Sequence, residues 1–230
     1  DATPTHSYLD YRYYYPQAAY PYASLVEENQ RRSRTDPPYN LVDTGVFGQD
    51  RYWDVRMVYA KQSPGIIHLR ISATNRGDRP DEIWLLPQLW FRNDWSWGDK
   101  SPNPDTPAGM WSVIADHRSL GKQYLYGQGD AELLFTENES NQERLSGTAS
   151  RSPWVKDAFH RYLVEGERQA VNPARRGSKF AAARHLSAAA GETVSIELVL
   201  SGSALDKPFA DSAAVFKQRG EEAGQFYSAL

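Results

Sequence analysis

The chain has 230 residues and no cysteine, and its 26 Lys and Arg residues nearly balance its 29 Asp and Glu residues, for a formal charge of -3. This charge excludes the strongly basic proteins that bind nucleic acid or anionic membranes through an electrostatic patch. The absence of cysteine excludes disulfide scaffolds and thiolate metal sites. No segment approaches the roughly 20 apolar residues of a membrane span. We therefore predict a soluble protein with one core, its compartment left open and the cytoplasm favoured.

The first fifty residues predict an irregular beginning to the fold. Residues 8–22 are rich in tyrosine but are interrupted by Pro16 and Pro21, which favours an edge strand or a packed irregular wrap. Residues 24–34 have helical propensity, and two prolines at 37–38 would stop that helix. A short helix after an edge segment is therefore expected here.

The middle of the chain changes to the period of two that is typical of strands with one buried face. Residues 52–59 show it in the alternation of Trp53, Val55, Met57 and Tyr59 with mostly polar neighbours. Together with two later runs this pattern predicts a β-meander over residues 52–59, 67–73 and 82–86. Further strands are expected at 111–115, 123–126, 131–136, 159–164, 179–186 and 193–200.

Many strands at short spacing predict a mainly β fold, a large antiparallel β-sandwich. Its boundaries are placed at residues 1–209, and residues 210–230 are assigned to a C-terminal amphipathic helix. In that helix an apolar stripe repeats every 3.6 residues, whereas Lys217, Glu221 and Glu222 face away. The stripe consists of Phe216, Ala223, Phe226, Tyr227 and Leu230. Such a helix needs a partner, and the chain begins without methionine, so we expect a piece of a longer protein.

One short segment has the composition of a sugar-binding surface. Residues 89–98 contain three tryptophans, a phenylalanine, an arginine and an amide. Pyranose rings present apolar faces and hydroxyl edges together, so aromatic faces beside polar groups suit them. The predicted substrate-binding residues are Trp90, Arg92, Asn93, Trp95 and Trp97. The alternative is structural, because tryptophans also plug the ends of β-sandwiches.

Other chemistry has weaker support in the sequence. Glu137 and Glu139 would share one face of an extended segment about 7 Å apart, within the range of glycosidase carboxylate pairs. Glu-x-Glu is nevertheless common at strand ends, so no catalytic residue is assigned. No cofactor or metal site is predicted, because the histidines are far apart and have no dense carboxylate shell. They are His6, His68, His117, His160 and His185.

Several stretches resemble the N-terminal region of bacterial and fungal glucosidase-like proteins of glycoside hydrolase family 63. The most specific is LPQLWFRNDWSW at residues 86–97, and the likeness covers most of the chain. The other stretches are PTHSY at 4–8, YPQA at 15–18, YNLVDTGVF at 39–47, LFTENE at 134–139, VKDAFH at 155–160 and AVNP at 170–173.

The resemblance implies a β-sandwich that precedes a C-terminal (α/α)6 barrel, in which that family's acid and base carboxylates reside. It therefore implies a noncatalytic domain of a glycosidase acting on α-glucosides or related oligosaccharides, inactive alone. Its expected partners are the barrel of the same polypeptide and an oligosaccharide substrate, with no nucleic acid and no membrane. Two alternatives stay open, a freestanding carbohydrate-binding module and a domain that merely scaffolds its neighbour.

Overall fold

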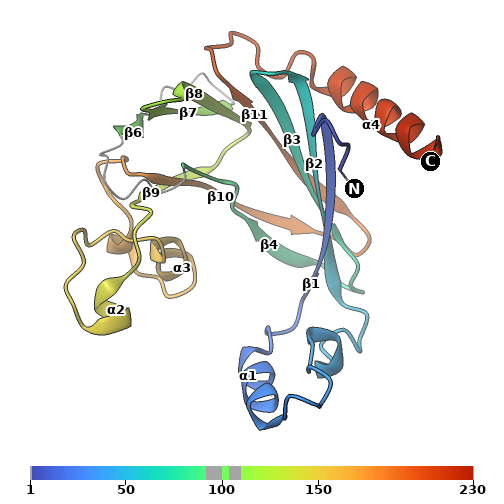
Figure 1. Cartoon of the computed structure of the whole chain (residues 1–230), viewed down its shortest axis with the longest axis vertical. Helices are drawn as coiled ribbons and strands as arrows, with labels where there is room; N and C mark the ends of the chain where they lie inside the picture. Colours follow the sequence, from blue (N-terminus) through green and yellow to red (C-terminus); the bar gives the residue numbers. More distant parts are fainter. Residues whose placement is uncertain (1, 92–99, 104–109, 230) are drawn as a thin grey trace.

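The structure is a computed structural model that describes residues 2–91, 100–103 and 110–229, and it is mainly β (Figure 1). Two antiparallel sheets face each other in a sandwich-like arrangement, with helices at the periphery. The predicted fold class, an antiparallel β-sandwich with a C-terminal helix, is confirmed. No helix in the described parts of the chain is long and apolar enough to cross a membrane.

The larger sheet has seven strands within the described residues, in the order β1-β2-β3-β11-β8-β7-β6. Its neighbouring strands all pair antiparallel. The tyrosine-rich strand β1 lies at one edge, as Pro16 at its end predicts, because proline cannot donate to a ladder. The bounds are β1 Tyr8–Pro16, β2 Tyr52–Ser63, β3 Ile66–Asn75, β6 Lys100–Asn103, β7 Met110–His117, β8 Gly121–Gln128 and β11 Thr193–Ser201.

The smaller sheet is built around β10, which pairs with β9 along one edge. Along the other edge it pairs with β4 and then β5, two consecutive strands of the chain. The predicted meander is therefore wrong in its third strand, because the chain crosses to the other sheet after β3 and β3 pairs with β11. Periodicity identifies the strand but carries no information on its partner. The bounds are β4 Asp81–Leu85, β5 Gln88–Trp90, β9 Glu132–Thr136 and β10 Lys179–Ala188.

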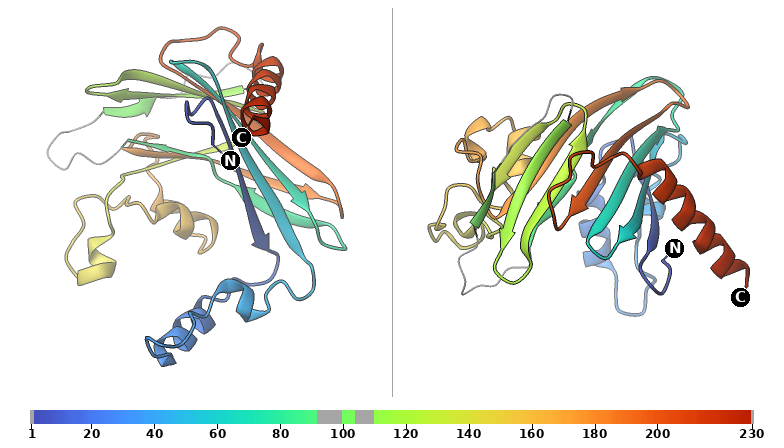
Figure 2. Two further views of the ribbon diagram at one scale, coloured as in Figure 1. Left: turned by 45° about the vertical axis from the view of Figure 1, so that its right-hand side comes forward. Right: turned by 90° about the horizontal axis from the view of Figure 1, so that it is seen from above.

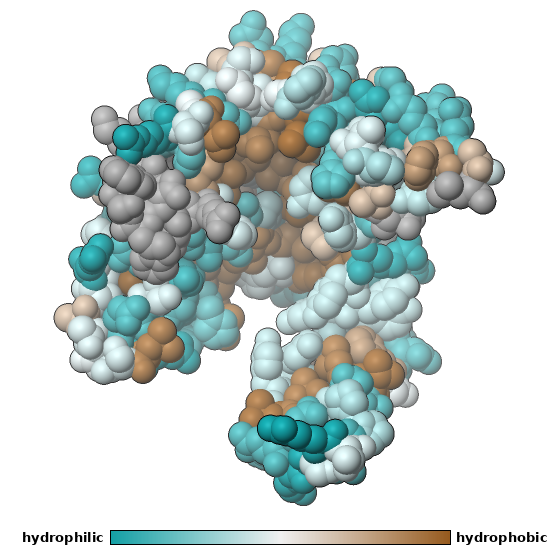
Figure 3. Space-filling view, viewed as in Figure 1, coloured by the Kyte–Doolittle hydropathy of each residue, from teal (hydrophilic) through white to brown (hydrophobic). Residues whose placement is uncertain are grey.

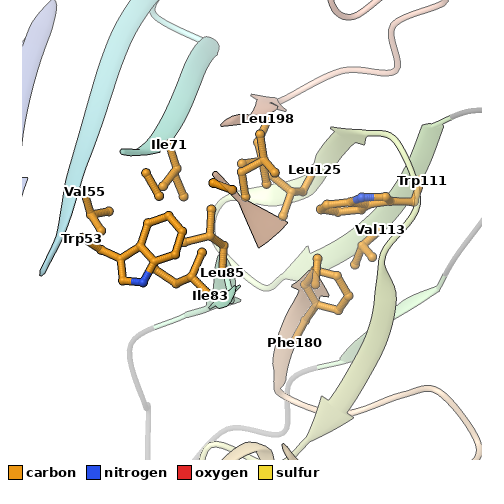
Figure 4. Close-up of a cluster of buried hydrophobic side chains, with 14 of the residues drawn as sticks. Trp53, Val55, Ile71, Ile83, Leu85, Trp111, Val113, Leu125, Phe180 and Leu198 are labelled. Atoms are coloured by element: carbon orange, nitrogen blue, oxygen red, sulfur yellow. The ribbon is translucent and has the colours of Figure 1, made fainter. Parts of the chain in front are cut away.

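The main core lies between the two sheets. Figure 4 shows Trp53 and Val55 of the larger sheet beside Ile83 and Leu85 of the smaller one. At the other end of the core the rings of Trp111 and Phe180 pack with centroids 5.7 Å apart. Each inward residue alternates with an outward one, so the period of two in the sequence fixes which side chains enter the core.

The chain between β9 and β10 contains short helices. They are α2 Gln142–Ser146, α3 Ala158–Leu163 and the 3-10 turn η2 Arg168–Ala170. The strand predicted at residues 159–164 is wrong, because α3 occupies this segment. Its buried residues Ala158, Phe159 and Tyr162 fall on one helical face, and Phe159 and Tyr162 contact the outer face of β9 and β10. Over six residues, an apolar face of this kind is not distinguished from a strand by periodicity alone.

Between β1 and β2 the chain leaves the body of the protein as an arm, defined here as residues 17–51. It carries α1 (Tyr22–Arg31) and the 3-10 helix η1 (Leu41–Thr44), and it projects from the sheets in two views (Figures 1 and 2). The helix predicted at 24–34 is thus confirmed. Neither α1 nor η1 buries a residue, and Val26 and Val42 are exposed.

The C-terminal helix α4 (Ser212–Ser228) lies against the outer face of β2 (Figure 2). Val215 and Phe216 contact Val58 and Ala60 there, which confirms the predicted helix. Of the predicted stripe, Phe216 and Ala223 are buried. Only the first part of the predicted stripe is covered, however. Phe226 and Tyr227 stay 40% and 42% exposed, and their rings pack edge-on against each other.

Candidate functional site

Trp90 is the predicted site residue that the structure describes. Arg92, Asn93, Trp95 and Trp97 lie outside the described residues. Trp90 ends β5 and alternates with Leu89, which packs against the main core, so its indole belongs to the outer face of the smaller sheet. It is 51% exposed. The structural alternative, a tryptophan buried in the core, therefore does not hold for Trp90.

Lys179 is the cross-strand partner of Trp90 on β10. Its Nζ lies 5.7 Å from the centroid of the Trp90 ring and 5.2 Å from that of Phe159, and it donates to the Lys156 carbonyl oxygen at 3.4 Å. Burial lowers the pKa of Lys179, and the neighbouring Lys156 charge lowers it further. The ammonium is thus partly desolvated between two aromatic rings.

A second exposed tryptophan stands on the same outer face. Trp84 of β4 is 43% exposed, whereas its neighbours Ile83 and Leu85 point into the core. Its ring stacks on the imidazole of His185, with centroids 4.5 Å apart and planes within 12°. His185 Nε2 lies 3.1 Å from a carboxylate oxygen of Glu82, which orients the imidazole. The pair forms a flat aromatic platform that faces outward.

A groove of about 370 Å³ runs beside this platform. One wall is the outer face of the smaller sheet, with Trp84, Gln88 and Lys179, and the other is the segment of Lys156 and α3. Phe159 and Tyr162 hold α3 in place by packing on β9 and β10. We call this cavity the outer groove. It combines an aromatic face, an amide and charged groups, which suits a small polar ligand with one apolar face.

A second groove has a different chemistry. It is a groove of about 460 Å³ between the two sheets, and Met57, Leu69 and Leu200 belong to its floor. Figure 3 shows apolar surface inside the hollow of the molecule. No charged side chain of the described residues lines it, so it suits aliphatic groups better than sugar hydroxyls.

The two glutamates of the Glu-x-Glu motif take part in structural contacts. A Glu137 carboxylate oxygen accepts hydrogen bonds from the backbone N–H and the hydroxyl of Ser178, at 3.1 and 2.5 Å. The Glu139 carbonyl oxygen accepts from the Lys156 backbone N–H at 2.9 Å. Glu137 thereby fixes the entry to β10. Among the described residues no group of three or more His, Asp or Glu could hold a metal ion.

Sequence reasoning did not single out Trp84, Gln88, Lys179 or His185 as site residues. The sequence did contain a signal for Trp84. In the alternating pattern of β4 it occupies an outward-facing position between the two core residues Ile83 and Leu85. Its meeting with His185 depends on the pairing of β4 with β10, which lies about one hundred residues further along the chain.

The fold and this exposed aromatic face define a mainly β, sandwich-like domain. No family model matches the chain. It is 32% identical over 276 residues to a protein of Saccharomyces cerevisiae described as "Uncharacterized protein YMR196W". The match covers 99% of this chain and 25% of the yeast protein, so the chain spans about a quarter of the length of that relative.

Proposed function

We propose that the chain is the noncatalytic β-sandwich domain of a glycoside hydrolase of the glucosidase type, acting on α-glucosides or related oligosaccharides. The domain packs on an (α/α)6 catalytic barrel of the same polypeptide, and its exposed aromatic face contributes to sugar binding. The observation that carries the proposal is the outer face of the smaller sheet, where Trp84 and Trp90 are exposed beside Gln88 and Lys179.

Sugar binding is supported by the geometry of this face. An exposed indole held flat by His185 offers a preformed stacking surface, so little side-chain entropy is lost on binding. Gln88 and Lys179 provide a hydrogen-bond acceptor and donors for hydroxyls at the same groove.

Packing on a further domain is supported by exposed apolar side chains far from the groove. Val26 and Val42 on the arm and Phe226 and Tyr227 on α4 are each at least 40% exposed. Contiguous apolar surface marks interfaces, and the rings of Phe226 and Tyr227 form such a pair on α4. In the yeast relative three quarters of the polypeptide lie outside the match, which leaves room there for a large second domain.

Sugar binding is tested by titrating the chain with maltotriose and following the indole resonances by NMR. Wild type is expected to bind, and Trp84→Ala with Trp90→Ala is expected to weaken binding at least about tenfold, or 1.4 kcal/mol. Tyr22→Ala is the matched control, because Tyr22 is an exposed aromatic residue on the arm. Absence of any shift in the wild-type indole resonances would contradict the proposed sugar-binding role.

The enzymatic part is tested on the longest native polypeptide that contains this chain. That polypeptide is expected to hydrolyse α-glucosides, and the double tryptophan variant is expected to lower kcat/KM without unfolding the protein. A native polypeptide that ends near Leu230 would instead indicate a freestanding module.

A further inference from the structure

We propose that the outer groove selects sugars that carry an anionic group, a carboxylate or a phosphate, with Lys179 as the residue that binds the anion. This inference rests on the proposed function and narrows it to a ligand class. The anion would approach the Lys179 ammonium, and the sugar would extend along the groove past Gln88, which pairs with Ala181 two residues further along β10.

The first argument is the missing counter-charge of Lys179. Its Nζ contacts the Trp90 and Phe159 rings and one backbone carbonyl oxygen, and no carboxylate of the described residues forms an ion pair with it. A partly desolvated ammonium loses hydration that aromatic rings and one neutral acceptor only partly replace. An anionic ligand would supply the missing partner.

The second argument is that the carboxylate of the groove lining interacts with arginines. Asp157 lines the groove, but its oxygens lie 3.7 Å from Arg144 and 4.0 Å from Arg161, and one accepts a hydrogen bond from Asn141 at 3.0 Å. No ion pair joins Asp157 to Lys179 among the described residues.

The third argument is the positive charge around the groove. Lys156 is exposed at the rim, and its charge acts on Lys179 strongly enough to lower the Lys179 pKa. Two lysines therefore line the groove from opposite walls, and Asp157 is the one carboxylate among the described lining residues. The cavity volume lies within the range of small-molecule sites, roughly 300–1,000 Å³.

The test is a calorimetric and NMR titration of the whole chain at constant ionic strength, with D-glucose, D-glucuronate, D-glucose 6-phosphate and inorganic phosphate. We expect an acidic sugar to bind at least about tenfold more tightly than glucose. The acidic sugar that binds more tightly shows whether the preferred anion is a carboxylate or a phosphate. Inorganic phosphate that binds as tightly as both would overturn the assignment to a sugar.

Three variants locate the effect. Lys179→Met keeps the aliphatic stem between the rings. It is expected to reduce the affinity for acidic sugars to that for glucose, and glucose itself should bind more weakly because a hydroxyl donor is lost. Lys179→Arg is expected to retain the preference, and Lys122→Met, at an exposed lysine of β8, is the matched control. A preference that survives in Lys179→Met would overturn the inference.

Failure of the inference and failure of the proposed function are distinguishable. Equal binding of glucose and glucuronate by the wild type would overturn the inference while sugar binding stands. If no neutral or acidic sugar shifts the Trp84 indole resonance, both are contradicted.

Discussion

The Asn75 side chain at the end of β3 donates a hydrogen bond from Nδ2 to the Ala188 carbonyl oxygen, 3.0 Å away, at the end of β10. This contact joins the two sheets at the point where the chain crosses between them. Nδ2 also donates to the Arg79 carbonyl oxygen, and Oδ1 accepts from the Gly77 N–H and from Gln17 Nε2, each at 2.8 Å. Asn75 is fully buried, so one amide satisfies four groups from three segments.

Asn75→Ala is expected to lower the free energy of unfolding by about 2–4 kcal/mol, because each buried group left without a partner costs about 1–3 kcal/mol. Urea denaturation followed by tryptophan fluorescence measures the change. Gln225→Ala, on the exposed side of α4, is the control and should stay within about 0.5 kcal/mol of wild type. A change of similar size in both variants would refute the role given to Asn75.

Ser212, the first residue of α4, connects that helix to the larger sheet. Its Oγ lies 2.9 Å from Nδ1 of the buried His68, whose Nε2 lies 2.8 Å from Gln62 Oε1. Because the amide oxygen only accepts, Nε2 carries the proton and the Ser212 hydroxyl donates to Nδ1. Ser212→Ala should therefore lower the unfolding free energy by about 1 kcal/mol, measured by thermal denaturation. Ser228→Ala near the exposed end of α4 should have a much smaller effect.

The same histidine makes stability depend on pH. Burial lowers the pKa of His68 below 6.5, although the charges of Glu197 and Asp211 act in the opposite direction. The unfolded chain therefore binds this proton at a higher pH than the folded chain. The stability that the neutral, buried His68 contributes is present in full above pH 6.5 and is lost as the pH falls through the pKa of the folded state. The free energy of unfolding then falls by at most about 1.4 kcal/mol per pH unit.

His68→Phe is the variant that isolates this contribution. It should be less stable at neutral pH, because Ser212 and Gln62 lose their partner, but its stability should fall less steeply between pH 7 and pH 5. Denaturant titrations at several pH values measure both slopes. Parallel slopes for wild type and variant would show that His68 does not titrate in this way.

Gly127 of β8 leaves no space for a side chain. A Cβ atom there would lie 2.1 Å from the Trp111 ring, which is buried in the core against Phe180. Gly127→Ala should therefore displace the indole and lower the unfolding free energy by about 1–3 kcal/mol. Near-ultraviolet circular dichroism and urea denaturation measure the two effects. Gly65→Ala meets nothing within 4 Å and serves as the control.

Truncation of Trp53 and of Trp90 should lower the free energy of unfolding by very different amounts. Trp53 is buried in the main core, so Trp53→Ala should cost about 3–5 kcal/mol. Trp90 is half exposed, so Trp90→Ala should cost less than about 1 kcal/mol. Chemical denaturation of both variants distinguishes them. If Trp90→Ala destabilised the protein as much as Trp53→Ala does, Trp90 would be a core residue and not part of the binding face.

The sequence by itself determined strands such as β2, because the alternation of residues such as Trp53, Val55 and Met57 directly encodes the two faces of a strand. It also indicated that β1 is not a central strand, through Pro16, and that the chain ends in an amphipathic helix, but it did not predict β5. It did not determine α3, because a six-residue apolar segment fits a helix and a strand equally well. The features that the sequence did determine depend on residues that are neighbours in the chain.

Only the tertiary structure decided which strands pair and what lies on the outer face. Trp84 meets His185, and Trp90 meets Lys179, because β4 and β5 add to β10 rather than continuing the larger sheet. About ninety to one hundred residues separate the members of these pairs. Such pairing is set by how two apolar faces close over a common core, and no local pattern in the sequence records that choice.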